Sequence, residues 1–207
     1  YLPFDLLESP FKGTQMEHSS EHFAGASSIE GKNGIFAMKL LERNKPNFTP
    51  GFKARKSVFC FDNRVICLGS DISNNNGKYA TETTLFQVAL KSQSETIIVN
   101  DNEVNEFPFG KEYDARKSFV CNDTKGNYYI VKNSGKVKVL KQHQYSLQNK
   151  SKKPTEGDFA SAYITHGNAP ENQGYEYMIL IQPDKKELKN IGDNSCSVLC
   201  KDSIVHA

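Results

Sequence analysis

The sequence lacks any hydrophobic run that could cross a bilayer, because no apolar stretch approaches the roughly 18 to 20 residues of a spanning helix. It also lacks a basic-then-apolar secretory leader, and it opens at Tyr1 without a methionine. We therefore expect no membrane span. We also expect the chain to be either a fragment of a longer protein or a mature product.

No charge of one sign is in excess, since 26 Lys and Arg oppose 24 Asp and Glu and leave a net charge of +2. The aromatic residues are dispersed and do not form a basic stacking platform, so we expect no nucleic-acid partner. A length of 207 residues with 37% hydrophobic residues is compatible with one large globular domain or two small ones.

Motifs of several enzyme classes are missing from the sequence. There is no glycine-rich phosphate loop, no Gly-x-Ser-x-Gly elbow and no zinc-protease pattern. His18 and His22 are four residues apart, but the surrounding sequence has no apolar face and no third ligand. Cys196 and Cys200 lack the Cys-x-x-Cys spacing of zinc sites. We therefore predict no metal site.

The five cysteines are an odd number, so at least one thiol is free or pairs between chains. If Asp62-Asn63 is a two-residue hairpin turn, Cys60 lies opposite Val65 and Cys67 lies opposite Val58. The two sulfurs then miss each other, which disfavours a disulfide. We predict that the cysteines are reduced thiols.

Strand signals dominate, and helical periodicity is scarce. The predicted strands cover residues 57–61, 64–69, 96–100, 127–132, 136–140 with a continuation over 143–148, 175–181 and 197–199. They are about 8 to 12 residues apart, with Gly, Asn, Asp and Pro in the gaps, which is typical of an all-β sandwich. Asn133-Ser134-Gly135 predicts a hairpin between the strands on either side of it. The residues around Glu17 to Ser28 indicate loops.

Three lysines alternate with apolar residues after this turn. Lys136, Lys138 and Lys141 flank Val137, Val139 and Leu140, and we predict that the lysines share one face of a strand. This pattern suits a solvated sheet face, and it also suits a stripe that binds glycosaminoglycan.

The stretch from Arg55 to Gln87 reads RKSVFCFDNRVICLGSDISNNNGKYATETTLFQ, and PTEGDFASAYITHG and GYEYMILIQP follow at 154–167 and 174–183. These motifs resemble the central β-sandwich of the chondroitin ABC lyases in polysaccharide lyase family 8. The resemblance implies an all-β, antiparallel, multi-sheet super-sandwich, galactose-mutarotase-like and truncated. It implies a single domain over 1–207. Residues 1–30 would be a loop-rich lead-in from an N-terminal helical toroid, and 31–207 a sandwich whose C-terminal part is missing.

Members of this family cleave chondroitin and dermatan sulfate by β-elimination at a uronic acid. The resemblance implies that His, Tyr and Arg on the toroid complete the site, so this piece alone would be inactive. It also maps the sandwich's glutamate to Glu82, which would orient an Arg or His from the toroid by a charge-assisted bond. The other interpretation of Glu82 is a solvated carboxylate at the start of a strand. For His166 we expect a structural hydrogen bond.

A polyanionic substrate favours basic side chains along the cleft, and Arg55 and Lys56 are the candidates. They could equally be a solvated strand edge. The rival function is a non-catalytic carbohydrate-binding or domain-packing module, and a third is a family 8 lyase acting on hyaluronan or xanthan. No cofactor is evident, although the family leaves room for a divalent cation in the full-length enzyme. The family also implies a periplasmic or extracellular location.

Overall fold

A computed structural model describes residues 19–42, 51–147, 153–190 and 196–207. Its strands are β1 (Ala24–Ile29), β2 (Asn33–Leu41), β3 (Lys53–Phe61), β4 (Arg64–Ser73), β5 (Ala80–Ala89), β6 (Ile97–Val99), β7 (Asn102–Val104), β8 (Phe109–Asp114), β9 (Phe119–Asn122), β10 (Tyr128–Lys132), β11 (Lys136–Leu147), β12 (Pro154–Asn168) and β13 (Gln173–Leu180). The described residues also form a short helix, α2 (Lys185–Lys189), whose first turn is capped by Asp184.

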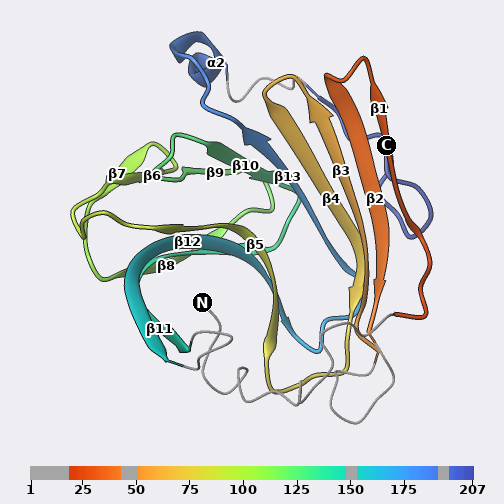
Figure 1. The fold of residues 1–207 in the computed structure, drawn as a ribbon, viewed down its shortest axis with the longest axis horizontal. Helices are drawn as coiled ribbons and strands as arrows, with labels where there is room; N and C mark the ends of the chain where they lie inside the picture. Colours follow the sequence, from red (N-terminus) through yellow and green to blue (C-terminus); the bar gives the residue numbers. More distant parts are fainter. Residues whose placement is uncertain (1–18, 43–50, 148–152, 191–195) are drawn as a thin grey trace.

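The strands form two antiparallel sheets that face each other (Figure 1). The larger sheet has nine strands in the order β1-β2-β3-β4-β13-β10-β9-β6-β7, and the smaller has four in the order β5-β12-β11-β8. In the smaller sheet β11 and β12 curve strongly, so that the face turned away from the larger sheet is concave (Figure 1). The predicted all-β, antiparallel, multi-sheet architecture is confirmed.

The core lies between the sheets and follows the two-residue period of the strands. In β11, Val137 and Val139 are fully buried, whereas Lys136 and Lys138 between and beside them are exposed. In β12, Ala160, Ala162 and Ile164 are inward in the same way, and the larger sheet adds Phe119, Cys121 and Val131. β11 and β12 therefore each have one apolar face in the core and one face directed away from it.

The hairpin predicted around Asp62-Asn63 is confirmed as β3 and β4. Cys60 pairs with Val65 and Cys67 pairs with Val58, as the two-residue turn requires. All five cysteines are free thiols, with Cys67 and Cys121 buried.

The hairpin predicted at Asn133-Ser134-Gly135 is wrong. The strands on either side exist, but β10 pairs with β9 and β13 in the larger sheet, while β11 pairs with β8 and β12 in the smaller one. Ser134 is buried at the crossing, where its hydroxyl donates to the Lys132 carbonyl and accepts from the Glu176 amide. Turn-forming residues predict that the backbone changes direction, but they do not predict which sheet the next strand joins.

Two further predictions fail at the ends of the chain. The loop predicted around Glu17 to Ser28 is wrong from Ala24 onward, because β1 pairs in register with β2 although its side chains are all exposed; residues 17 and 18 lie outside the described ranges. The strand predicted over 197–199 is also wrong. Near it the structure has an isolated bridge between Lys201 and His206.

The predicted row of three lysines holds for Lys136 and Lys138 and is wrong for Lys141. Lys141 is three positions after Lys138, and an odd step along a strand moves a side chain to the other face. Lys141 therefore lies on the inner face with Val137 and Val139, where it is 0% exposed. Its ammonium lies 3.4 Å from the Val104 carbonyl oxygen. Burial lowers the pKa of Lys141, and the charges of Glu95 and Glu106 oppose that effect.

Gly69 permits a close contact between β4 and β13, since a Cβ there would lie 2.1 Å from Cε1 of the Tyr175 ring. We predict that Gly69→Ala lowers the free energy of unfolding by about 1 to 3 kcal/mol, because the buried ring must shift. Denaturant unfolding measures the loss. Gly77→Ala is the control, because a Cβ there would meet nothing within 4 Å. Equal stability of the two variants would contradict the contact.

Candidate functional site

Glu82 points out of the core on the concave face of the small sheet. It lies near the start of β5, where it pairs with Thr165 of β12, while the next residue, Thr83, pairs with Ile164. Ile164 is 0% exposed, and directly paired residues share a face, so Thr83 faces inward and Glu82 faces outward. The side chain of Glu82 is exposed on the residue scale.

Lys138 and Tyr163 share this face with Glu82. They pair directly across β11 and β12, and Tyr163 is a diagonal neighbour of Glu82. Partial burial among these groups raises the pKa of the Glu82 carboxyl, and the Lys138 ammonium works against that rise. Burial and the Glu82 charge raise the pKa of Tyr163, which Lys138 opposes by its charge and a hydrogen bond. The Glu82 carboxyl, the Lys138 ammonium and the Tyr163 phenol thus interact electrostatically with one another.

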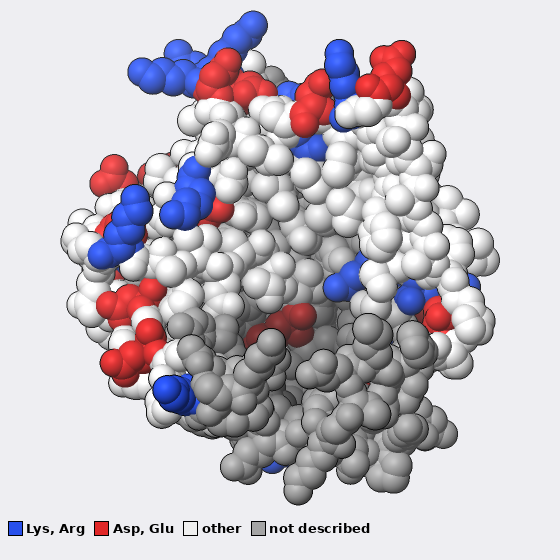
Figure 2. Space-filling model, viewed as in Figure 1, with Lys and Arg blue, Asp and Glu red and all other residues white. Residues whose placement is uncertain are grey.

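Further polar groups share the concave face with the outward Leu140. The Gln87 amide donates to Oε1 of Gln144 at 2.6 Å, and the Lys136 ammonium lies 2.6 Å from Oε1 of Glu112. In the view of Figure 2, acidic side chains lie in a hollow of the surface, with basic side chains beside it. Amides, charges and a phenol on a concave sheet are groups that can hydrogen-bond the hydroxyls of an extended sugar chain.

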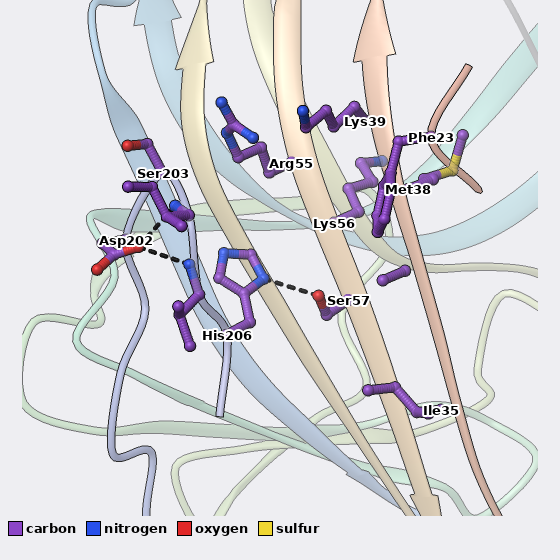
Figure 3. Close-up of a pocket in the computed structure, with 13 residues that line it drawn as sticks. Phe23, Ile35, Met38, Lys39, Arg55, Lys56, Ser57, Asp202, Ser203 and His206 are labelled. Atoms are coloured by element: carbon purple, nitrogen blue, oxygen red, sulfur yellow. Dashed lines mark hydrogen bonds between the residues drawn. The ribbon is translucent and has the colours of Figure 1, made fainter. Parts of the chain in front are cut away.

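Arg55 and Lys56 lie on β3 in the larger sheet, whereas Glu82 lies on β5 in the smaller one. Nε of Arg55 is 3.6 Å from Oδ2 of Asp71, whose other oxygen lies 2.8 Å from the Lys53 ammonium. Arg55 lines two adjoining grooves of about 570 and 780 Å³. Figure 3 shows the smaller groove, where Arg55 and Lys39 lie together on one side of the apolar side chains of Phe23 and Met38.

His166 provides the hydrogen bond expected of it, to a side-chain hydroxyl. Nε2 of His166 and Oγ1 of Thr83 lie 2.8 Å apart. Burial lowers the pKa of His166 to about 4, and repulsion from Lys56 adds to the effect. The ring is therefore neutral at pH 7. His166 thus interacts with both sheets: it bonds Thr83 on β5, the strand that carries Glu82, and it is repelled by Lys56 on β3.

His206 is a site residue that sequence reasoning missed, since no motif surrounds it. Its Nδ1 lies 2.8 Å from Oγ of Ser57 and its Nε2 lies 2.8 Å from Oγ of Ser70 (Figure 3 draws the Ser57 bond). Ser70 donates to the Asp202 carbonyl at 2.6 Å, so it accepts from Nε2–H, and Nδ1 accepts from Ser57. Burial lowers the pKa of His206, with Lys201 adding to it, which suits this neutral ring. The ring fastens the C-terminal segment to β3 and β4.

Over the described residues no three His, Cys, Asp or Glu side chains gather as metal ligands would. His18 lies outside those ranges. None of the helices in the described part of the chain could span a bilayer.

Comparison with protein families gives a match to the super-sandwich domain of polysaccharide lyase family 8 over residues 6–191. The chain is 34% identical over 213 residues to a chondroitin sulfate ABC endolyase of Proteus vulgaris, covering 100% of this chain and 21% of that protein. It is 39% identical over 188 residues to a chondroitin sulfate ABC exolyase of the same organism, covering 88% and 18%. The chain thus spans about a fifth of the length of these relatives.

A solved structure, the xanthan lyase of Paenibacillus, superposes with a TM-score of 0.73 at 23% identity over 88% of this chain and 18% of that one. At this identity the likeness concerns the fold. It supports the two-sheet architecture and carries no information on which polysaccharide this chain meets.

The Lys138 ammonium is the charge that opposes the raised pKa of Glu82. We predict that Lys138→Met raises this pKa further, because the carboxylate loses its neighbouring cation while its burial stays. The change is measured by ¹³C NMR titration of labelled glutamate side chains.

Lys136→Met is the matched control, because Lys136 lies on the same face and pairs with Glu112. A fall in the Glu82 pKa in Lys138→Met, or an equal rise in both variants, would contradict the assignment.

Proposed function

This chain belongs to polysaccharide lyase family 8, as its super-sandwich domain, and from that premise we propose that it is the central domain of an enzyme that degrades chondroitin and dermatan sulfate by β-elimination. The names of its relatives support this substrate class. We propose one β domain over 1–207, with further sandwich after residue 207. The predicted lead-in from an N-terminal helical toroid over 1–30 is shortened to the residues before β1, since β1 belongs to the larger sheet. The toroid is its intramolecular partner, and without it the chain is inactive.

β-Elimination at a uronic acid needs a base for the C5 proton, an acid for the leaving O4 and a group that offsets the carboxylate charge. In this proposal the toroid supplies the proton-transfer groups, and Glu82 orients one of its cationic side chains by a charge-assisted hydrogen bond. The observation that carries the proposal is the outward position of Glu82 on a concave polar face. Its raised pKa, beside Lys138 and Tyr163, supports a carboxylate kept partly out of water.

Substrate contacts in the proposal come from two places. Lys138 lies on the face of Glu82 and meets a polyanion there, and Lys136 on the same face contributes less because it pairs with Glu112. Arg55 and Lys56 remain proposed substrate-binding residues, for another part of the polysaccharide. The ion pair of Arg55 with Asp71 already offsets part of its charge, so its contribution is smaller than that of an unpaired arginine.

We propose a periplasmic or extracellular location, as suits an enzyme that meets polymeric glycosaminoglycan. No cofactor enters the proposal for this chain, and the full-length enzyme has room for a divalent cation. The nearby hyaluronan and xanthan activities of the family are the alternatives in substrate.

A non-catalytic carbohydrate-binding or domain-packing module is the rival function. The amide pair of Gln87 and Gln144, on the same face of the sheet as the Tyr163 ring, favours it, since amides and an aromatic face bind sugars without chemistry. Retention of the chain on a heparin column at low salt, unchanged by Glu82→Ala, would support this module.

We predict that Glu82→Gln in the full-length enzyme lowers turnover at least about a hundredfold, the scale of losing one organised group of an active site. The assay follows the ultraviolet absorbance of the unsaturated uronate product from chondroitin 4-sulfate. A near-normal rate would refute the role of Glu82.

The same absorbance assay tests the shared site. The chain is mixed with the separately expressed toroid, and each part is also assayed alone. Product from the mixture and from neither part alone is the expected result. A folded, glycan-binding chain that never yields product with the toroid would favour the binding module.

A further inference from the structure

Glu82 is flanked by two threonines that both turn inward, under the concave face. Thr81 and Thr83 have the opposite parity to Glu82 on β5, and each hydroxyl is held by a side chain from outside that strand. Asn74 donates its amide to the Thr81 hydroxyl, and His166 meets the Thr83 hydroxyl at 2.8 Å. The backbone at Glu82 is thus fixed from both sides by contacts that do not touch the carboxylate.

Asn74 is itself well anchored. It is 6% exposed, its backbone N–H donates to the Pro170 carbonyl at 3.0 Å, and its Oδ1 accepts from the Asn76 amide at 2.8 Å. Since all of these bonds come from the segment around β4 and the turn before β13, Thr81 is tied to the larger sheet. One of the two contacts therefore sets the start of β5 relative to the other sheet.

The second contact coincides with an irregularity in β12. Glu82 pairs with Thr165 and Thr81 pairs with Gly167, so His166 is an extra residue of β12 that lies between these two pairs. Gly167 has a φ of 79°, a conformation that glycine adopts at little cost. A bulge of this kind bends its strand and re-aims side chains, and such bulges are common beside active sites. Here the bulge turns the His166 ring towards Thr83.

The environment of His166 keeps this contact constant. The ring is half-buried, lies with its centroid 6.3 Å from that of Tyr175, and faces the charge of Lys56. Nε2 of a neutral imidazole can donate to or accept from the Thr83 hydroxyl, so the contact persists wherever the ring stays uncharged.

We propose that Asn74 and His166 are positioning residues for Glu82, acting through the hydroxyls of Thr81 and Thr83 to aim its carboxylate over the concave face. This inference rests on the proposed function for its catalytic consequence, and on geometry alone for its effect on Glu82. A side chain displaced by about 1 Å can cost as much as a hundredfold in rate, so loss of either hydroxyl contact reaches the chemistry without removing a reacting group.

The test uses Thr83→Val, which keeps the shape of the side chain and removes the hydroxyl. Thr83→Ser keeps the hydroxyl and is the rescue variant. Thr155→Val is the matched control, because Thr155 donates to the Ser146 carbonyl at 3.2 Å in the same sheet. It lies ten residues before Thr165 on β12, about 33 Å along the strand at the usual rise.

In this chain alone, ¹³C NMR titration of Glu82 is the readout that needs no activity. The proposal expects a shifted Glu82 pKa in Thr83→Val, an unshifted one in Thr83→Ser, and an unshifted one in Thr155→Val. A Glu82 titration identical in Thr83→Val and the unmodified chain would overturn the proposal, whether or not Glu82 proves catalytic.

In the full-length enzyme, Thr83→Val is expected to lower turnover about tenfold or more, with Thr83→Ser and Thr155→Val near the unmodified rate. Combined with Glu82→Gln it should cause no further loss, because both changes act on one group. Normal turnover in Thr83→Val beside a slow Glu82→Gln would overturn this inference and leave the proposed function standing. Normal turnover in Glu82→Gln would overturn the proposed function instead.

If Thr83→Val fails to fold, Thr81→Val takes its place, since it breaks the Asn74 contact and leaves the His166 contact intact. The same titration and the same double variant with Glu82→Gln then decide the question by the same outcomes.

Discussion

Alternation of side chains across the four-stranded sheet is the constraint on which the other features depend. The inward residues of β11 and β12 are fully buried against the larger sheet, and each such Val or Ile contributes about 1.5 to 3 kcal/mol by leaving water. A slip of one residue would expose this set and bury Lys136, Lys138 and Tyr163. Because that exchange is so costly, the register is fixed, and the outward position of Glu82 follows from it.

The strand β12 contributes both to the core between the sheets and to the candidate site around Glu82. It pairs with β5 on one side and β11 on the other, so it sets where Glu82 lies relative to Lys138. Its residues alternate between Tyr163 on the concave face and Ile164 in the core. At its end the extra residue His166 interrupts the alternation beside Glu82. The strand thus combines a regular stretch that holds the sheet together with one irregular position next to the candidate site.

Local patterns in the sequence predicted local structure well. Asp62-Asn63 between two β-branched runs gave both the hairpin and its register, because a two-residue turn leaves a single pairing. The same kind of evidence failed at Asn133-Ser134-Gly135, because the choice between two sheets depends on packing between distant strands. β1 was missed because small, exposed residues such as Ala24 and Ser27 have little strand signal of their own, and pairing with β2 supplies the rest.

The candidate site was predictable in part. The resemblance singled out Glu82, but parity along β5 could not have given its outward direction. Leu85 and Phe86 are adjacent and both buried, because Leu85 is an extra residue in the pairing with β12. Its neighbours Lys138 and Tyr163 lie far along the chain, and no spacing rule connects them with it. Arg55 and Glu82 belong to one continuous motif in the sequence, so only the sheet order could show that they lie in different sheets. His206 had no signal, because its two serine partners are on strands well over a hundred residues away.

The division between the two faces of the small sheet, interrupted on β5 by the adjacent buried residues Leu85 and Phe86, has a consequence for protein engineering. Core and recognition face are encoded by residues of alternate parity, so a designer could rewrite the outward positions of β5, β11 and β12 while leaving the packing layer untouched. The domain is in that sense a scaffold with an exchangeable surface. Its adaptation to a different polysaccharide would be limited by the few irregular places, such as the bulge at His166, where the two sets of residues meet.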